Sequence, residues 1–450
     1  MLARLGLRIS AIFRAFVPDP FVLAVLLTVV TLLLTIVTRP SDVGVGEHLH
    51  SMVRVWAGSD GVWNLLAFGM QMCLILVTGH ALVTSRPMRR VLDRLAGAPT
   101  SPRQAILLVG VVAMLLGLFN WGVGLVGGAL LARQVAIEMK TKGRRVHYPL
   151  LCASGYLAML VWHGGFSGSA PLKMSNATDA ASILGENAVV VPLDATLTGS
   201  LNLVVTGGLL VIAPILLCLM HPDDEHVVVG DPPAPLEDGS VTSDKGPLPR
   251  LLEDTPLLTV VVVVLIGAWA VWYYGTGGVR RLGPNEVNLT LLMLGLIAHG
   301  TPARYLRAVE AGTGACAGII LQFPLYAGIM GLMKASGLTT LMAEAMASGA
   351  LVPLKTFGAA AVVNLFVPSG GGQWAIQGPI AMEAARDAGI DPARMVMAVA
   401  YGDEVTNMLQ PFWALPLLAI TRTRARDIVG YTAVVMLVAA AWMALWLVIL

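Results

Sequence analysis

Eleven stretches of 17 to 29 residues without any Asp, Glu, Lys or Arg run through this 450-residue chain. They cover 20–38, 61–85, 104–132, 148–172, 195–220, 255–279, 287–303, 311–333, 356–382, 405–421 and 428–450. A membrane-spanning helix needs about 20 apolar residues, so most of these stretches could supply one. Only 12% of the residues are charged, against about 25% in a soluble domain. The sequence therefore predicts an all-α polytopic membrane protein embedded in a lipid bilayer.

One long polar segment divides the apolar stretches into two halves. Residues 221–254 are acidic and rich in proline, which is typical of a flexible cytoplasmic linker. We expect a first membrane half at 17–220 and a second at 255–450. Residues 1–16 carry arginines among apolar residues, which predicts an amphipathic segment at the membrane surface. The net charge of +2 offers no electrostatic footprint for nucleic acid.

The basic clusters predict how the chain crosses the membrane. Cytoplasmic loops carry an excess of Lys and Arg, and such clusters flank segment 104–137 on both sides. A segment that starts and ends on one side is a re-entrant hairpin. Applied to the basic residues around 350–385, the same rule places both ends of this segment on the outer side of the membrane. This predicts a second hairpin, of opposite orientation. The result is nine crossings and two hairpins, with a cytoplasmic N-terminus and a periplasmic C-terminus.

Each half also contains a helix that the sequence interrupts. The first broken helix, 148–172, is interrupted by glycines and serines that begin after His163, and a proline follows eight residues later. The second, 392–420, is interrupted around Asp403, again eight residues before a proline. Two inverted-topology repeats with discontinuous helices are typical of secondary transporters, whose substrate site lies near the membrane midplane. Non-helical backbone at that depth persists where it lines a cavity or is buried in protein.

Polar groups at the hairpin tips and in the breaks are the candidates for substrate binding. Free N–H groups at half-helix starts favour an anion, and three consecutive glycines allow close backbone approach. Helix packing by the hydroxyls and a structural role for His163 are the alternatives. No basic residue lies inside either break, so we expect N–H and hydroxyl groups to hold the anion. The predicted substrate-binding residues are Asn120, Trp121, Gly122, His163, Gly165, Ser167, Ser169, Ser369, Gly370, Gly371, Gly372, Gln373, Thr406 and Asn407.

Asp403 and Glu404 are the acidic residues inside the breaks. A carboxylate at the centre of a membrane helix costs at least about 2.5 kcal/mol, so it needs a partner or a function. We expect at least one of them, together with His163, to couple transport to H⁺ or Na⁺; the alternative is that one caps the unwound turn. No organic cofactor is expected. The residues beside which a sodium ion would bind are Asn120, Ser369 and Asn407.

Two other classes of protein use similar features. An anion channel or a facilitator also contains broken helices, although paired opposite breaks favour alternating access. The sequence Gly165-Phe166-Ser167-Gly168 matches the GxSG pattern of intramembrane serine proteases, with His299 as the base in that scheme. Such an enzyme gives no role to nine crossings and a second break, so this alternative is unfavoured.

At these motifs the sequence resembles the bacterial short-chain fatty acid transporter family. The most specific segments are FVPDPFVLAVLLT (16–28), NWGVGLVGGALLARQ (120–134), YPLLCASGYLAMLVWHGGFSGSAPL (148–172), FVPSGGGQWAIQGP (366–379) and GDEVTNMLQPFWALPLLAI (402–420). The resemblance implies an inner-membrane carrier of short-chain monocarboxylates such as butyrate and acetoacetate, and no enzyme.

The sequence is more remotely similar to the ion transporter superfamily, which includes the divalent anion/sodium symporters. This similarity implies an elevator motion and a homodimer. That superfamily places Ser-Asn-Thr type motifs at its hairpin tips, whereas this chain has Asn-Trp-Gly and Pro-Ser-Gly there. The departure leaves both H⁺ and Na⁺ open as the coupling ion.

Overall fold

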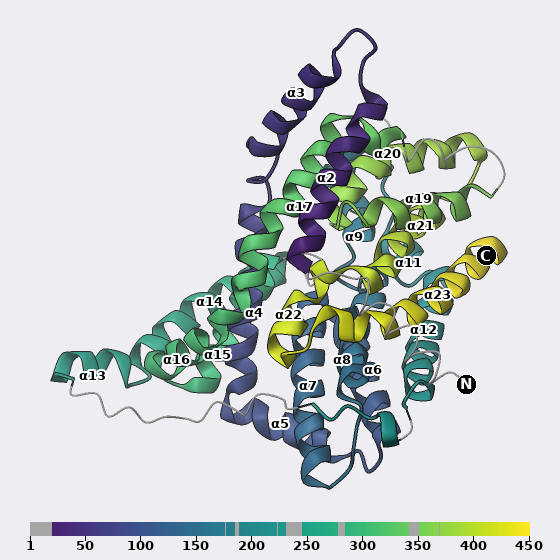
Figure 1. The fold of residues 1–450 in the computed structure, drawn as a ribbon. Helices are drawn as coiled ribbons and strands as arrows, with labels where there is room; N and C mark the ends of the chain where they lie inside the picture. The colour runs from purple at the N-terminus through teal and green to yellow at the C-terminus, as the bar shows by residue number, and fades with distance from the viewer. Residues whose placement is uncertain are drawn as a thin grey trace.

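Helices make up the architecture of the whole described chain (Figure 1). The computed structural model describes residues 20–175, 177–184, 189–222, 224–230, 245–277, 284–341, 351–368 and 370–450, and no strand occurs within these ranges. Eight helical segments among them are long and apolar enough to cross a membrane. The eight are Phe21–Thr38, Pro102–Phe119, Trp121–Thr141, Tyr148–Ser175, Ser200–Leu219, Pro247–Thr276, Ala317–Ala335 and Ala425–Ile449. The prediction of an all-α polytopic membrane protein is confirmed.

A peripheral group of helices runs from the top of the view to its left, with α5 at the bottom (Figure 1). Its members are α2 (Pro20–Leu34), α3 (Val45–Ala57), α4 (Leu66–Thr84), α5 (Arg86–Gly97), α13 (Pro247–Glu253), α14 (Leu257–Gly277), α15 (Pro284–His299), α16 (Pro302–Thr313) and α17 (Ala317–Ala335). Helix α17 packs against α2, α3 and α4, and α4 packs against α15 and α16.

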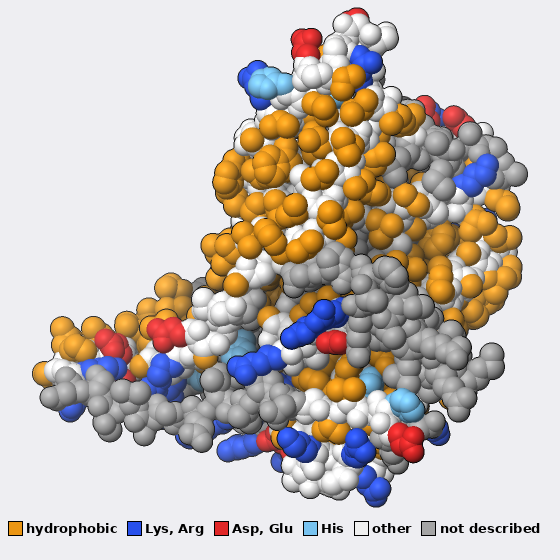
Figure 2. Space-filling view, viewed as in Figure 1, with side chains coloured by type: hydrophobic (Ala, Val, Ile, Leu, Met, Phe, Trp, Pro, Cys, Tyr) orange, Lys and Arg blue, Asp and Glu red, His pale blue; other side chains and the backbone are white. Residues whose placement is uncertain are grey.

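The outer face of α2 and α17 is covered with exposed apolar side chains (Figure 2). Val29 and Leu33 on α2 are at least half exposed, as are Ile320 and Leu321 on α17. Exposing a contiguous apolar surface of this kind to water is unfavourable, whereas contact with the hydrocarbon of a bilayer is not. The face is therefore suited to contact with lipid.

A central group of helices holds the two predicted hairpins and the two broken helices. The first pair is α6 (Pro102–Phe119) and α7 (Trp121–Thr141), and the second is α19 (Val352–Asn364) and α20 (Gly370–Ala388). Around them pack α8 (Tyr148–Tyr156), α9 (Ser169–Ser175), α10 (Ala177–Leu184), α11 (Leu193–Thr196), α12 (Ser200–Leu219), α21 (Pro392–Thr406), α22 (Pro411–Thr421) and α23 (Ala425–Ile449). Helix α6 packs against α7 and α8, and α19 packs against α21.

The first broken helix loses regular structure in steps. Helix α8 tightens into the 3₁₀ segments η2 (Leu157–Leu160) and η3 (Trp162–Gly164), and α9 begins at Ser169. Gly165 has an extended backbone (φ −113°, ψ −174°). A Cβ there would stand 2.3 Å from the carbonyl oxygen of Leu118 on α6, so only glycine allows the break to lie this close to the hairpin.

The second broken helix is interrupted at a proline. Helix α21 runs into the 3₁₀ turn η8 (Asn407–Leu409), and α22 restarts at Pro411. Proline has no N–H and forces the preceding residue out of helical geometry; Gln410 accordingly has φ −85° and ψ 119°.

Some of the segments predicted from the sequence lie among the described residues and others do not. Segment 1–16 lies outside them, and of the linker 221–254 only residues 221–222, 224–230 and 245–254 are described. The two helix pairs occupy the segments predicted as hairpins, 104–137 and 350–385. Their re-entrant course through the bilayer and the inverted repeat stay predictions.

Candidate functional site

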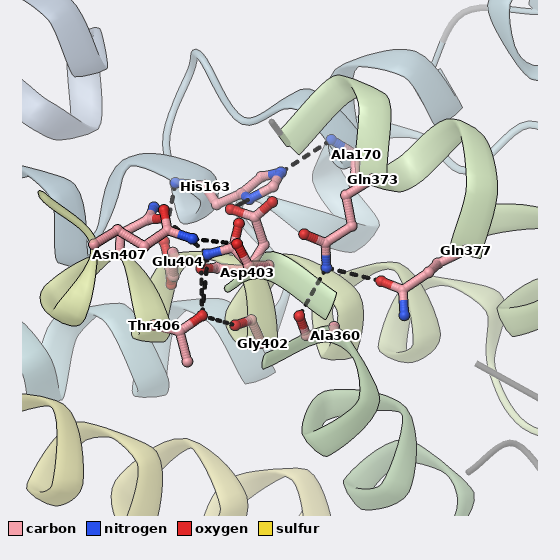
Figure 3. Close-up of polar contacts among 12 residues, drawn as sticks. His163, Ala170, Ala360, Gln373, Gln377, Gly402, Asp403, Glu404, Thr406 and Asn407 are labelled. Carbon is pink, nitrogen blue, oxygen red and sulfur yellow. Dashed lines mark hydrogen bonds and ion pairs between the residues drawn. The ribbon is translucent and has the colours of Figure 1, made fainter. Parts of the chain in front are cut away.

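The two broken helices meet at His163, Asp403 and Glu404 (Figure 3). The backbone N–H of His163 donates a hydrogen bond to Glu404 Oε2 over 3.0 Å. His163 Nδ1 lies 3.4 Å from Asp403 Oδ1. The three residues are 1%, 1% and 0% exposed, respectively. The predicted ion-coupling residues therefore form one buried cluster, although 240 residues separate His163 from Asp403 in the sequence.

The hydrogen bonds of His163 define its tautomer. Its Nε2 accepts the backbone N–H of Ala170 at 3.2 Å, in the first turn of α9. A nitrogen that accepts a hydrogen bond carries no proton, so a neutral imidazole here bears its proton on Nδ1. Nδ1 is the ring nitrogen that lies 3.4 Å from Asp403 Oδ1, without a hydrogen bond between them. The ring also stacks on Trp162, with centroids 4.3 Å apart.

The two carboxyl groups are poor in hydrogen-bond donors. Among the described residues, neither carboxylate oxygen of Asp403 accepts a hydrogen bond, and Glu404 Oε1 accepts none. A buried carboxylate without donors is costly unless it binds a proton or a cation. The site can therefore take up positive charge.

Asn364 at the end of α19 connects the second helix pair to the second break. Its Nδ2 donates to the backbone oxygen of Asp403 (2.6 Å), Thr406 Oγ1 (3.0 Å) and Asn407 Oδ1 (2.9 Å). Gln410 donates in turn to the backbone oxygen of Asn364. The predicted residues Thr406 and Asn407 are thus held in the cluster by a residue that the sequence analysis did not single out.

The tip of the first pair contacts the first break. Asn120 caps α7 by accepting the N–H groups of Gly122 (2.9 Å) and Val123 (3.3 Å). Trp121 donates its backbone N–H to Ser167 Oγ over 3.0 Å. The side chains of Asn120 and Ser167 therefore have protein partners in this conformation.

Three tryptophans lie at this junction. Trp413 on α22 contacts Trp121 and Trp162, with ring centroids 5.3 and 6.2 Å apart.

The serine protease alternative lacks its catalytic pair, because Nε2 of His299 lies 2.7 Å from the carbonyl oxygen of Ala81.

The start of α20 lies against the first break and α9. A Cβ on Gly370 would stand 3.0 Å from His163 Cε1 and 3.2 Å from Ser169 Oγ. Gly371 is next to it, and Gly372 lies in the same helical turn. Ser369, predicted at this tip, lies outside the described residues.

Gln373 in the first turn of α20 donates two hydrogen bonds within the second helix pair. Its Nε2 donates to the backbone oxygen of Ala360 (2.9 Å) and to Gln377 Oε1 (2.7 Å). Its Oε1 has no partner among the described residues and lies on the side of Asp403 (Figure 3).

Lys173 is a further residue that the sequence analysis missed. A Cβ on Gly371 would lie 3.5 Å from Lys173 Nζ and 4.0 Å from Ser169 Oγ. The charge-free stretch 148–172 ends immediately before this lysine, so the search for charges inside the break did not reach it. A lysine within two residues of a break in a membrane helix is the signal that could have identified it.

Comparisons with known proteins show what the chain is similar to. A family model described as "Short chain fatty acid transporter" matches residues 1–450. Two relatives carry the name "Putative short-chain fatty acid transporter". The Escherichia coli (strain K12) protein is 40% identical over 441 residues, covering 96% of each chain. The Haemophilus influenzae (strain Rd) protein is 37% identical over 446 residues, again covering 96% of each.

Two solved structures of transporters also match. Neisseria gonorrhoeae MtrF, described with a class of antimetabolite efflux pumps, aligns with a TM-score of 0.44 at 16% identity, covering 97% of this chain and 96% of that one. The Alcanivorax borkumensis YdaH transporter, described as having an unusual topology, aligns with a TM-score of 0.44 at 17% identity, covering 96% and 97%.

Proposed function

The chain belongs to the short-chain fatty acid transporter family, and on this premise we propose that it is an ion-coupled secondary transporter of short-chain monocarboxylates such as butyrate and acetoacetate. As a member of that family it is a transporter and not an enzyme. The observation that carries the proposal is the buried cluster of His163, Asp403 and Glu404 between two broken helices. Such a cluster supports ion coupling, which a simple facilitator does not need.

The substrate carboxylate binds in this proposal to N–H and hydroxyl groups at the tips and breaks. The start of α20 and Ser169 supply such donors beside His163. A short acyl tail would pack on nearby aromatic groups such as Trp121, Phe166 or Trp374. Helix starts favour anions because their first N–H groups have no acceptor within the helix.

The coupling ion binds in this proposal at Asp403 and Glu404. A proton would neutralise a carboxyl group that has no donor, and His163 would relay it. A sodium ion would instead use oxygen ligands near Asn120, Ser369 and Asn407. An elevator motion and a homodimer, both implied by the superfamily resemblance, complete the proposed cycle in the bacterial inner membrane.

Uptake of labelled butyrate and acetoacetate into proteoliposomes tests the function, with pH and sodium gradients imposed separately. We expect accumulation above the equilibrium level under one of the two gradients. Flux that ignores both gradients would support the facilitator alternative and overturn the coupling. Failure to transport either acid would overturn the substrate class.

A further inference from the structure

Lys173 lies inside a candidate membrane-spanning segment, Tyr148–Ser175, and makes no ion pair with the described part of the chain. Lysines at such positions are rare, and they commonly face a cavity or pair with a charge, often on a substrate pathway. An ammonium group that no carboxylate of the described residues neutralises can accept the charge of a ligand.

The surroundings of this ammonium group are suited to a small anion. Lys173 and Ser169 are four residues apart on α9, so their side chains share one face of that helix. Both lie against Gly371, at 3.5 Å and 4.0 Å from the position of its absent Cβ. Helix α20 begins one residue earlier, at Gly370, so the positive end of its helix dipole lies at the same place.

A second observation connects this place with the buried cluster. His163 Cε1 lies 3.0 Å from the position that a Cβ on Gly370 would take. The adjacent ring nitrogen, Nδ1, lies 3.4 Å from Asp403 Oδ1, so one imidazole ring links the two places. Asp403 and Glu404 beside this histidine would repel an anion, so a carboxylate at this place requires a nearby positive charge.

We propose that Lys173 holds the carboxylate of the substrate, between the Gly370–Gly371 start of α20 and the hydroxyl of Ser169. The inference rests on the proposed function, because it names the residue that would recognise the acid group. It departs from the expectation from the sequence, in which N–H and hydroxyl groups alone hold the anion. Lysine binds such a group as a point charge with three donors.

Binding of butyrate to the purified protein tests the proposal. The variants are Lys173→Gln, Lys173→Arg and Lys173→Cys, with Lys334→Gln as the matched control, because Lys334 is an exposed lysine at the end of α17. The measurement is the dissociation constant of butyrate, fitted to the rise of the melting temperature with butyrate concentration. We expect Lys173→Gln to raise it by a factor of about 10 to 100, since a hydrogen bond to a charged group contributes about that much.

A charge rescue separates an electrostatic role from a structural one. Treatment of the Lys173→Cys protein with 2-aminoethyl methanethiosulfonate rebuilds an ammonium group, and the four native cysteines are buried. We expect this treatment and Lys173→Arg to recover part of the affinity. We also expect formate, acetate and hexanoate to be weakened by the same factor as butyrate, because the carboxylate is what they share.

Several results would overturn the proposal. An unchanged dissociation constant in Lys173→Gln would do so, as would a loss of affinity that neither arginine nor the rebuilt ammonium recovers. Wild-type protein that no acid from formate to hexanoate stabilises would do so too. Wild-type proteoliposomes that bind butyrate through Lys173 and do not transport it would contradict the proposed function and leave this inference standing.

Discussion

Adjacent carboxyl groups in the buried cluster have different surroundings. Glu404 accepts the backbone N–H of His163, whereas Asp403 faces the ring of that histidine without accepting a hydrogen bond. We expect Glu404→Gln and Asp403→Asn to retain butyrate binding and to lose gradient-driven accumulation, because an amide neither takes up a proton nor neutralises the charge of a bound cation. The internal concentration of labelled butyrate in proteoliposomes should fall to the external one.

The matched control for these variants is Glu383→Gln. Glu383 is an exposed carboxylate on α20 whose Oε1 lies 3.6 Å from Arg386, and surface ion pairs of this kind contribute at most about 1 kcal/mol. Its neutralisation should leave accumulation unchanged. If both cluster variants still accumulated butyrate, the coupling role of this cluster would be wrong.

Asn364 supplies one amide to three acceptors of the second break. We expect Asn364→Ala to lower the stability by about 1 to 3 kcal/mol, since the buried acceptors lose their donor. The measurement is thermal unfolding of the detergent-solubilised protein. Asn285→Ala, which removes an exposed hydrogen bond to Gln71, should cost far less; equal effects would refute a special role for Asn364.

At the scale of elements, the first break and α6 lie close together because Gly165 has no side chain. Gly165→Ala would place a methyl group 2.3 Å from the carbonyl oxygen of Leu118 and 2.7 Å from its Cα. Backbone atoms cannot move aside easily, so we expect destabilisation of about 1 to 3 kcal/mol or more and a lower melting temperature. Gly207→Ala on α12 is the control, because no atom lies within 4 Å of its Cβ position; a melting temperature for Gly165→Ala no lower than for this control would contradict the close approach.

Hydropathy and helix breakers sufficed to predict the helical fold and the two breaks, because lipid exposure and proline act locally in the sequence. The interruption predicted around Asp403 in the broken helix 392–420 begins a few residues later, at the turn η8, because α21 continues to Thr406 before α22 starts at Pro411. Helices α3, α5 and α16, which carry charges, connect the spans and gave no apolar signal.

Contacts between distant elements could not be predicted in the same way. The sequence showed Asp403, Glu404 and His163 as polar residues in breaks, and the structure brings them together. Asn364 and Lys173 looked unremarkable in sequence, because their importance arises from partners on other helices. Which buried polar atoms pair with each other depends on tertiary packing, and tertiary packing cannot be derived from a single sequence.

The whole molecule should lie in the membrane with opposite ends on opposite sides. The basic clusters predict that Arg90 lies in the cytoplasm and the C-terminus in the periplasm. We expect Leu450→Cys to react with a membrane-impermeant maleimide on intact cells, and Arg90→Cys to react only after permeabilisation. The wild type is the blank because its four cysteines are buried. Reaction of both variants on intact cells would contradict the predicted topology of nine crossings.

The three indoles at the junction also give the protein an optical property. Trp121, Trp162 and Trp413 come from the first hairpin pair, the first break and the second broken helix, and they lie close enough to share excitation energy. His163 stacks on Trp162 at 4.3 Å, where an imidazolium quenches indole emission by accepting an electron. The difference in fluorescence between the wild type and Trp162→Phe would therefore report, without any added dye, when a proton reaches His163.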